Sequence, residues 1–100
     1  DSKHLLPAHK AALDRLADML EKEPSVTLNV NGYTDNTGPA GANREISKQR
    51  ARIVADYLAG NGVDNTRLNV SGRGEADPFA SNKTSHGRAL NRRVELTISE

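Results

Sequence analysis

Apolar residues recur at helical spacing in two stretches of this chain. Across residues 5–23 they fall on one helical face, and Pro7 suits the first turn of such a helix. Across residues 43–59 a second stripe has the same spacing, and Gly60 and Gly62 follow it. The pattern predicts two helices, with apolar faces formed by Leu13, Leu16, Ala17 and Leu20 and by Ile46, Ile53, Val54, Tyr57 and Leu58.

Three shorter segments instead alternate between apolar and polar residues, which is typical of half-buried strands. They are residues 26–33, 67–71 and 93–99. Residues 72–82 contain turn-forming residues and predict an irregular connection. The strand–helix–strand portion predicts a right-handed parallel crossover, and the last strand could pair in either direction.

The order of these elements predicts a single α+β domain over residues 1–100. Two main helices should pack on one face of a small mixed sheet, giving a two-layer sandwich. The other face of the sheet should contact water, because its side chains are polar: Thr27, Asn29, Asn31, Asn69, Ser71, Glu95 and Thr97.

The composition mainly excludes classes of function and adds less about the fold. Hydrophobic residues make up 35% of the 100 residues, and aromatic residues only 3%, so the core must be aliphatic. The net charge of +1 describes a surface of mixed sign, which argues against a dedicated nucleic-acid binder. The sequence contains no cysteine for disulfides or thiol chemistry, and no apolar run long enough to cross a bilayer.

Asp35 and Arg50 are the most informative pair of side chains. Asp35 lies where a predicted strand runs out into a loop, and Arg50 interrupts the apolar stripe of the second predicted helix. A zwitterionic ligand needs such a pair, an anion for its ammonium and a cation for its carboxylate. The alternative is a structural salt bridge between the two, which contributes only about 0–1 kcal/mol when exposed.

Three arginines precede the last predicted strand, and they leave two interpretations open. A phosphate or nucleic-acid patch would need aromatic stacking partners, which the segment lacks. We therefore expect some of these arginines to tie down the preceding loop, by donating to backbone carbonyls or to carboxylates such as Glu75 and Asp77. The three residues are Arg88, Arg92 and Arg93.

No pattern of catalytic or metal-binding residues stands out. His4 and His9 are five positions apart and miss the spacing that would aim both at one metal ion. Ser47 and Ser71 have no candidate base near them in the sequence. We expect no metal, no cofactor and no enzymatic activity, and a hydrolase is the minority hypothesis.

Several ordered motifs resemble the OmpA-like C-terminal domain. The longest are NGYTDNTG at residues 31–38 and GRALNRRVE at residues 87–95, and the resemblance runs from about residue 13 to residue 98. It implies a peptidoglycan-binding module that recognises the diaminopimelate of the stem peptide. Asp35 would then take the ammonium group and Arg50 the carboxylate, bidentately where the geometry allows. Thr37, Asn43 and Ile46 match positions that line the same pocket, and Asn91, Arg92 and Arg93 match a segment that braces it.

The resemblance also implies a location and one departure from the family pattern. The parent protein would be tethered to a membrane through other parts of its chain, with this domain on the periplasmic or wall-facing side of the cell envelope. Family members usually begin with a strand before the first helix. Here the chain starts at Asp1, where the loop after that strand should be finishing, so we expect this strand to be absent and one sheet edge to be unpaired. The competing interpretation is a structural or protein-interaction domain with Asp35 and Arg50 as an internal salt bridge.

Overall fold

The computed structural model describes residue 5 and residues 7–99, and it confirms the predicted α+β fold. Both predicted helices and all three predicted strands are present, with boundaries moved by at most three residues. One further helix lies where the sequence pattern predicted none. The elements are α1 (Pro7–Lys22), β1 (Thr27–Gly32), α2 (Ala40–Gly60), the short 3₁₀ helix η2 (Asn65–Arg67), β2 (Leu68–Gly72), α3 (Ser85–Asn91) and β3 (Val94–Ser99).

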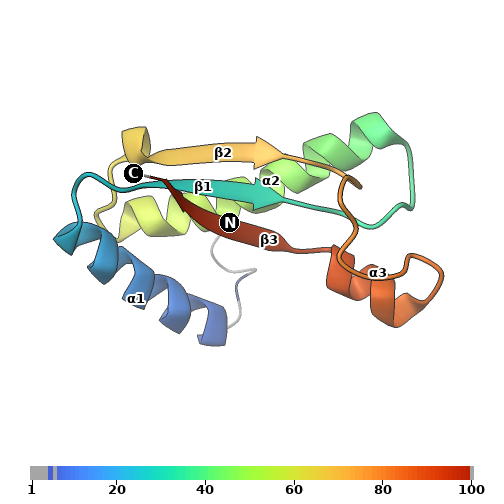
Figure 1. The fold of residues 1–100 in the computed structure, drawn as a ribbon, viewed down its shortest axis with the longest axis horizontal. Helices are drawn as coiled ribbons and strands as arrows, with labels where there is room; N and C mark the ends of the chain where they lie inside the picture. The colour runs from blue at the N-terminus through green and yellow to red at the C-terminus, as the bar shows by residue number, and fades with distance from the viewer. Residues whose placement is uncertain (1–4, 6, 100) are drawn as a thin grey trace.

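The three strands form a mixed sheet in the order β2–β1–β3 (Figure 1). β1 pairs in parallel with β2 and antiparallel with β3, so that Val30 lies opposite both Val70 and Leu96. Among the described residues, β3 therefore has a strand on one side only. The expected absence of an earlier strand concerns residues 1–4, which lie outside the described part of the chain.

The core lies between the sheet and the helices α1 and α2, and it is aliphatic as the composition predicted. Its most deeply buried members include Leu20, Leu28, Val30, Ala55 and Leu58. The last strand departs from this pattern. Leu96 and Ile98 stand on the face that the alternation made apolar, yet they are 36% and 53% exposed. α2 covers mainly β1 and β2, which leaves the edge strand half covered.

The opposite face of the sheet is polar and none of its predicted residues is buried, as expected. Its side chains also hydrogen-bond across the strands. The Asn29 amide donates to the hydroxyls of Thr97 and Ser99, and the Asn69 amide donates to the Asn29 carbonyl oxygen. These bonds join all three strands on the side that no described helix covers.

Arg67 connects the end of α1 to the start of β1. Its guanidinium donates to the carbonyls of Val26 at 3.0 Å, Leu20 at 2.9 Å and Glu23 at 2.7 Å. Backbone N–H groups of Glu23 and Val26 already donate to the carbonyls of Leu20 and Glu23, so the arginine adds a charged donor to groups at the end of the helix that are already paired. Arg67 is a structural residue.

A glycine at the end of β1 sets how closely α2 approaches the sheet. A Cβ atom built on Gly32 would lie 1.9 Å from the backbone oxygen of Ser47, a distance that real atoms do not adopt. The absent side chain lets the first half of α2 rest directly on the end of the strand. This contact positions the part of α2 that carries Arg50 beside the loop that follows β1.

The additional helix α3 is short and has no apolar stripe, which is why the pattern did not predict it. Its N-cap is Thr84, whose hydroxyl accepts from the backbone N–H of Gly87 at 2.9 Å. Gly87 is itself buried, and a Cβ atom there would lie 1.8 Å from the backbone oxygen of Ser81. Capping and close packing against the preceding loop thus hold this helix, which carries Arg88 and leads directly into Arg92.

Candidate functional site

The candidate site lies at the end of the sheet where β1 finishes and β3 begins, beside α3 (Figure 1). Beyond β1, the backbone N–H of Tyr33 donates to the Arg93 carbonyl at 2.8 Å, and that of Thr34 donates to the Gly74 carbonyl at 2.7 Å. These bonds hold an extended segment between the start of β3 and the loop after β2. The segment delivers Asp35 to a fixed position, where it is only 5% exposed.

The carboxylate of Asp35 is held by three donors. One oxygen, Oδ1, accepts the backbone N–H of Thr37 at 2.9 Å and also the Thr37 hydroxyl. The other, Oδ2, accepts Nη1 of Arg92 at 2.6 Å. The Thr37 hydroxyl is the largest cause of a lowered pKa of Asp35, the Thr37 backbone N–H is the next, and Arg92 acts in the same direction. Burial opposes them, and the pKa falls from 3.8 to about 2. Asp35 is therefore ionised at any physiological pH.

Arg50 contacts the chain two residues before Asp35 and is not the partner of that carboxylate. Its Nη1 donates to the carbonyl of Tyr33 at 3.4 Å, and the partner of Asp35 is Arg92. The internal salt bridge between Asp35 and Arg50 that the sequence left open is thus replaced by one with Arg92. The antiparallel pairing of β1 with β3 brings Arg92, just before β3, next to the end of β1.

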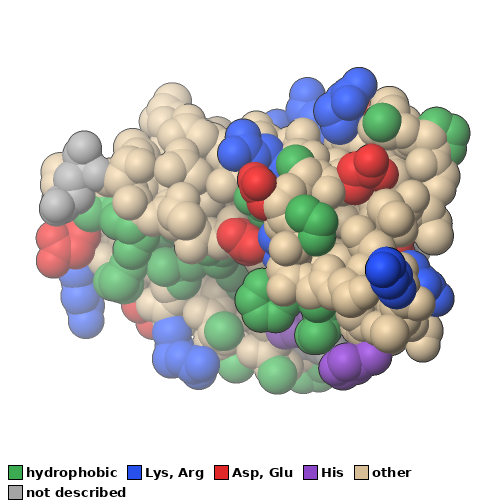
Figure 2. Space-filling model, turned by 45° about the vertical axis from the view of Figure 1, so that its right-hand side comes forward, with side chains coloured by type: hydrophobic (Ala, Val, Ile, Leu, Met, Phe, Trp, Pro, Cys, Tyr) green, Lys and Arg blue, Asp and Glu red, His purple; other side chains and the backbone are tan. Residues whose placement is uncertain are grey.

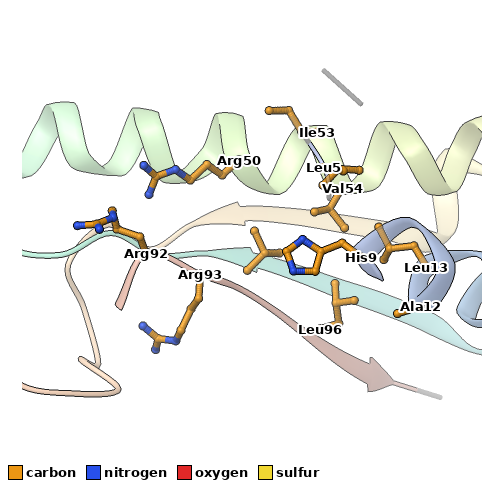
Figure 3. A pocket seen from close by; sticks show the side chains of 11 residues that line it. Leu5, His9, Ala12, Leu13, Arg50, Ile53, Val54, Arg92, Arg93 and Leu96 are labelled. Carbon is orange, nitrogen blue, oxygen red and sulfur yellow. The ribbon is translucent and has the colours of Figure 1, made fainter. Parts of the chain in front are cut away.

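A pocket of about 590 Å³ opens between α1, α2 and β3 (Figure 3). Arg50, Arg92 and Arg93 stand together toward one end of it, as Figure 3 shows, and His9 stands among apolar side chains further along. Among the described residues, no aspartate or glutamate lines the pocket, so its arginine end favours an anionic group. The other lining residues are Leu5, Ala12, Leu13, Ile53, Val54, Val94 and Leu96.

Arg92 and Arg93 are neighbours in the sequence but contact different groups. Arg92 faces Asp35, whereas the Arg93 guanidinium lies over the ring of Tyr33, 3.9 Å from its centroid. Arg93 also contacts Glu95 through Nε at 2.6 Å and donates to the carbonyl of Asp77 at 2.9 Å. The expectation that some of these arginines tie down the preceding loop is confirmed, since Arg88 likewise donates to the Asn82 carbonyl at 3.0 Å.

Asn91 holds the same loop from inside the protein. It is fully buried, and its side chain accepts from the N–H of Ala80 at 2.8 Å and donates to the Ala80 carbonyl at 2.9 Å. A third bond runs from its amide to Oδ1 of Asn82 at 2.8 Å. Asn91 therefore shapes the loop on which the site rests, as a bracing residue should.

The other predicted pocket residues surround the loop after β1. Asn43 is buried, and its amide lies 3.3 Å from the Gly38 carbonyl and 3.5 Å from Oε2 of Glu75. Ile46, one turn further along α2, is 42% exposed. The structure brings Thr37 into contact with Asp35 and places Asn43 against the same loop, whereas Ile46 is exposed, and none of the three lines the pocket of about 590 Å³.

Two buried hydroxyl groups near the site were not predicted to matter. Ser47 donates to the Arg44 carbonyl at 2.8 Å and accepts from the backbone N–H of Gly74 at 2.9 Å, which joins α2 to the loop after β2. The hydroxyl of Thr34 is buried and has no hydrogen-bond partner among the described residues. One feature of the sequence pointed to Ser47: it lies one turn before Arg50, on the face of α2 that contacts the sheet.

Three other kinds of site concern the rest of the described residues: a patch of one charge, a metal site and a membrane-spanning helix. Figure 2, which brings the α3 end of the molecule forward, shows acidic and basic side chains next to each other rather than a large area of one charge. Within residues 5 and 7–99, no three histidine, aspartate or glutamate side chains come together as metal ligands would. None of the helices in this part of the chain is long and apolar enough to cross a membrane.

Comparison with known proteins identifies several relatives. The chain is 48% identical to the peptidoglycan-binding protein ArfA of Mycobacterium tuberculosis over 99 residues, which are 99% of this chain and 30% of ArfA. It is 46% identical to the probable lipoprotein YiaD of Escherichia coli over 98 residues, which are 98% of this chain and 45% of YiaD. The chain thus spans less than half the length of these curated relatives.

Solved structures show the same fold. The C-terminal domain of Helicobacter pylori MotB matches with a TM-score of 0.85 and 30% identity, over 96% of this chain and 75% of that one. The peptidoglycan-associated lipoprotein of Burkholderia pseudomallei matches with a TM-score of 0.91 and 25% identity, over 95% and 80%. The model of the OmpA family matches residues 1–92. The chain therefore belongs to the OmpA family.

Proposed function

We propose that this domain binds peptidoglycan non-covalently, by holding the diaminopimelate of the stem peptide between Asp35 and Arg50. The side chain of diaminopimelate ends in a carbon that carries both an ammonium and a carboxylate. The observation that carries the proposal is an aspartate that stays ionised beside the arginine-lined end of a pocket. Such an arrangement offers one charge to each group of the ligand.

The hydrogen-bonding capacity of Asp35 leaves room for an ammonium. An ionised carboxylate accepts about four hydrogen bonds, and three donors from Thr37 and Arg92 occupy Asp35. One further acceptor site remains for a cationic donor. The Thr37 contacts would keep the carboxylate oriented while that donor approaches.

Arg50 supports the carboxylate half of the proposal. Its hydrogen bond to the Tyr33 carbonyl is long, at 3.4 Å, and engages one of its terminal nitrogens. A guanidinium has five N–H donors in a planar fork that matches a carboxylate, so this contact orients Arg50 without consuming its capacity. Arg92, on the same side of the pocket, adds positive potential and remains paired with Asp35.

The expected affinity is modest. A charge-assisted hydrogen bond contributes roughly 1.5–3 kcal/mol, so two of them with additional backbone contacts give a dissociation constant between micromolar and millimolar. A module with this affinity can hold a protein at the cell wall because the wall presents many identical sites. We place the domain in the cell envelope, on the wall-facing side of a protein whose other parts supply any membrane attachment.

The relatives favour binding over catalysis. The name of ArfA records peptidoglycan binding, and YiaD is named as a probable lipoprotein. In the site itself, Asp35 is the acidic group, and its low pKa makes it a poor general acid at neutral pH. A wall hydrolase would need a nucleophile or an acid–base pair beside it, so we propose a module without enzymatic activity or cofactor.

The test is an NMR titration of the labelled domain with soluble muropeptides of two kinds. A diaminopimelate stem offers both charges, whereas a lysine stem keeps the ammonium and lacks the second carboxylate. Saturable shifts around Asp35 and Arg50 are expected with the diaminopimelate ligand, and at least tenfold weaker binding with the lysine ligand. Equal affinity for the two would contradict the two-charge mechanism.

Variants separate binding from a purely structural role. Asp35→Asn and Arg50→Ala should each weaken binding of the diaminopimelate ligand, while Arg52→Ala, an exposed arginine on the same helix, should leave it unchanged. If Asp35 and Arg50 served the fold alone, both variants would lower the melting temperature and keep the affinity for the ligand. Amidation of the diaminopimelate carboxylate should weaken binding to the native domain, because Arg50 would then face a neutral group.

A further inference from the structure

Phe79 is the only phenylalanine of the chain, and it is 69% exposed. It lies on the connection between β2 and α3. A single exposed apolar side chain is ordinary on a protein surface. Phe79 differs because its ring stands next to a guanidinium that belongs to the site.

Two aromatic rings lie near the guanidinium of Arg93. Its guanidinium carbon is 3.9 Å from the centroid of the Tyr33 ring and 5.8 Å from that of Phe79, the second at the outer limit of a cation–π contact. Tyr33 is buried and Phe79 is exposed, so the three side chains form a cluster that reaches from the interior to the surface. The cluster presents the apolar ring of Phe79 to water.

Arg93, the central member of this cluster, is held by several contacts. The Arg93 guanidinium contacts Glu95 at 2.6 Å and donates to the carbonyls of Asn91 at 3.1 Å and Asp77 at 2.9 Å. Its side chain is only 16% exposed. Because Arg93 is fixed, the Phe79 ring beside it should lose little conformational freedom on binding, which is the property of a preorganised contact.

The cluster of Tyr33, Arg93 and Phe79 adjoins the proposed diaminopimelate site. The Tyr33 carbonyl accepts the hydrogen bond from Arg50, Asp35 follows two residues later, and Arg93 lines the pocket. Two residues of extended chain span about 7 Å. In peptidoglycan, two amino acids separate diaminopimelate from the sugar that carries the stem peptide, so a ligand seated at Asp35 and Arg50 has its sugar within reach of the surface around Phe79.

We propose that Phe79 is a stacking platform for a pyranose ring of the glycan strand, in addition to the peptide contacts. One face of a pyranose presents mainly C–H groups, which lose contact with water when they lie against an aromatic ring. The domain would then bind both the peptide and the sugar attached to it. This inference rests on the proposed binding of peptidoglycan, and it assigns Phe79 and Arg93 to a second part of the same ligand.

The test compares two soluble ligands that share the same diaminopimelate-containing tripeptide, one carrying the amino-sugar disaccharide and one without sugar. Dissociation constants are measured by calorimetry or NMR for the native domain and for Phe79→Ala. We expect Phe79→Ala to weaken binding of the sugar-bearing ligand about three- to tenfold and to leave binding of the free tripeptide unchanged. Phe79→Trp, which keeps a flat ring, should retain the affinity for the sugar-bearing ligand.

Matched controls make the outcome decisive. Leu90→Ala removes another exposed apolar side chain of the same region and should change neither affinity. The inference is overturned if Phe79→Ala has no effect on the sugar-bearing ligand, or weakens both ligands equally. A native domain that binds neither ligand refutes the proposed function as well, whereas binding of the tripeptide with no added contribution from the sugar refutes the role of Phe79 alone.

Discussion

Replacement of Thr37 by valine should raise the pKa of Asp35 toward its ordinary value. Valine retains the backbone N–H that donates to Asp35 at 2.9 Å and removes only the hydroxyl donor. That hydroxyl is the largest single cause of the low pKa, ahead of the charge on Arg92. Arg92 lowers the pKa of Asp35 separately, through its hydrogen bond and through its charge, and water screens that charge because the side chain is partly exposed.

The magnitude follows from the shift itself. The pKa of Asp35 falls from 3.8 to about 2, and one unit corresponds to about 1.4 kcal/mol, so the ionised carboxylate contributes up to about 2 kcal/mol to the free energy of unfolding. Because the pKa of the folded state is the lower one, this contribution is present above pH 3.8. It is lost as the pH falls from 3.8 to about 2.

The assay is an NMR titration of the Asp35 carboxyl carbon, together with urea unfolding at pH 7 and pH 3. The Thr37→Val variant should titrate closer to pH 3.8 and lose less stability between the two pH values than the native domain. Thr66→Val is a matched control, since Thr66 makes the same two contacts to Asp64 and lowers its pKa. It should alter the titration of Asp64 and leave Asp35 unchanged. An unchanged pKa of Asp35 in Thr37→Val would refute the reasoning.

Three further predictions concern the scaffold of the site. Arg67→Ala should lower the free energy of unfolding by about 2–4 kcal/mol, because three carbonyls lose a charged donor, whereas Arg52→Ala should change it by less than about 0.5 kcal/mol; similar urea midpoints for the two variants would contradict this. Gly32→Ala should cost at least about 2 kcal/mol, since its methyl group would overlap the backbone of Ser47, and an unchanged melting temperature would show that α2 can move away. Asn91→Leu should cost roughly 2–4 kcal/mol in thermal unfolding, because two buried backbone groups lose their partner, and a stable variant would disprove that role.

The sequence alone determined the elements and the family. Helical spacing and alternation are local patterns, so they predicted two helices, three strands and an aliphatic core without knowledge of the tertiary contacts. Ordered motifs identified the resemblance to OmpA-like domains, and the odd placement of Asp35 and Arg50 directed attention to one end of the sheet. The pattern missed α3, because a seven-residue helix held by the Thr84 cap and the buried Gly87 has no apolar stripe to reveal it.

The tertiary structure decided which charged groups meet. Asp35 and Arg92 are 57 positions apart and become neighbours only because β3 runs antiparallel to β1. The same pairing places Arg93 over Tyr33, and the other hydrogen bonds of the Arg93 guanidinium go to β3, to the end of α3 and to the loop after β2. Spacing along a chain constrains which residues share a helix face or a strand face. Contacts between elements depend on register and packing, which arise only when the whole sheet has formed.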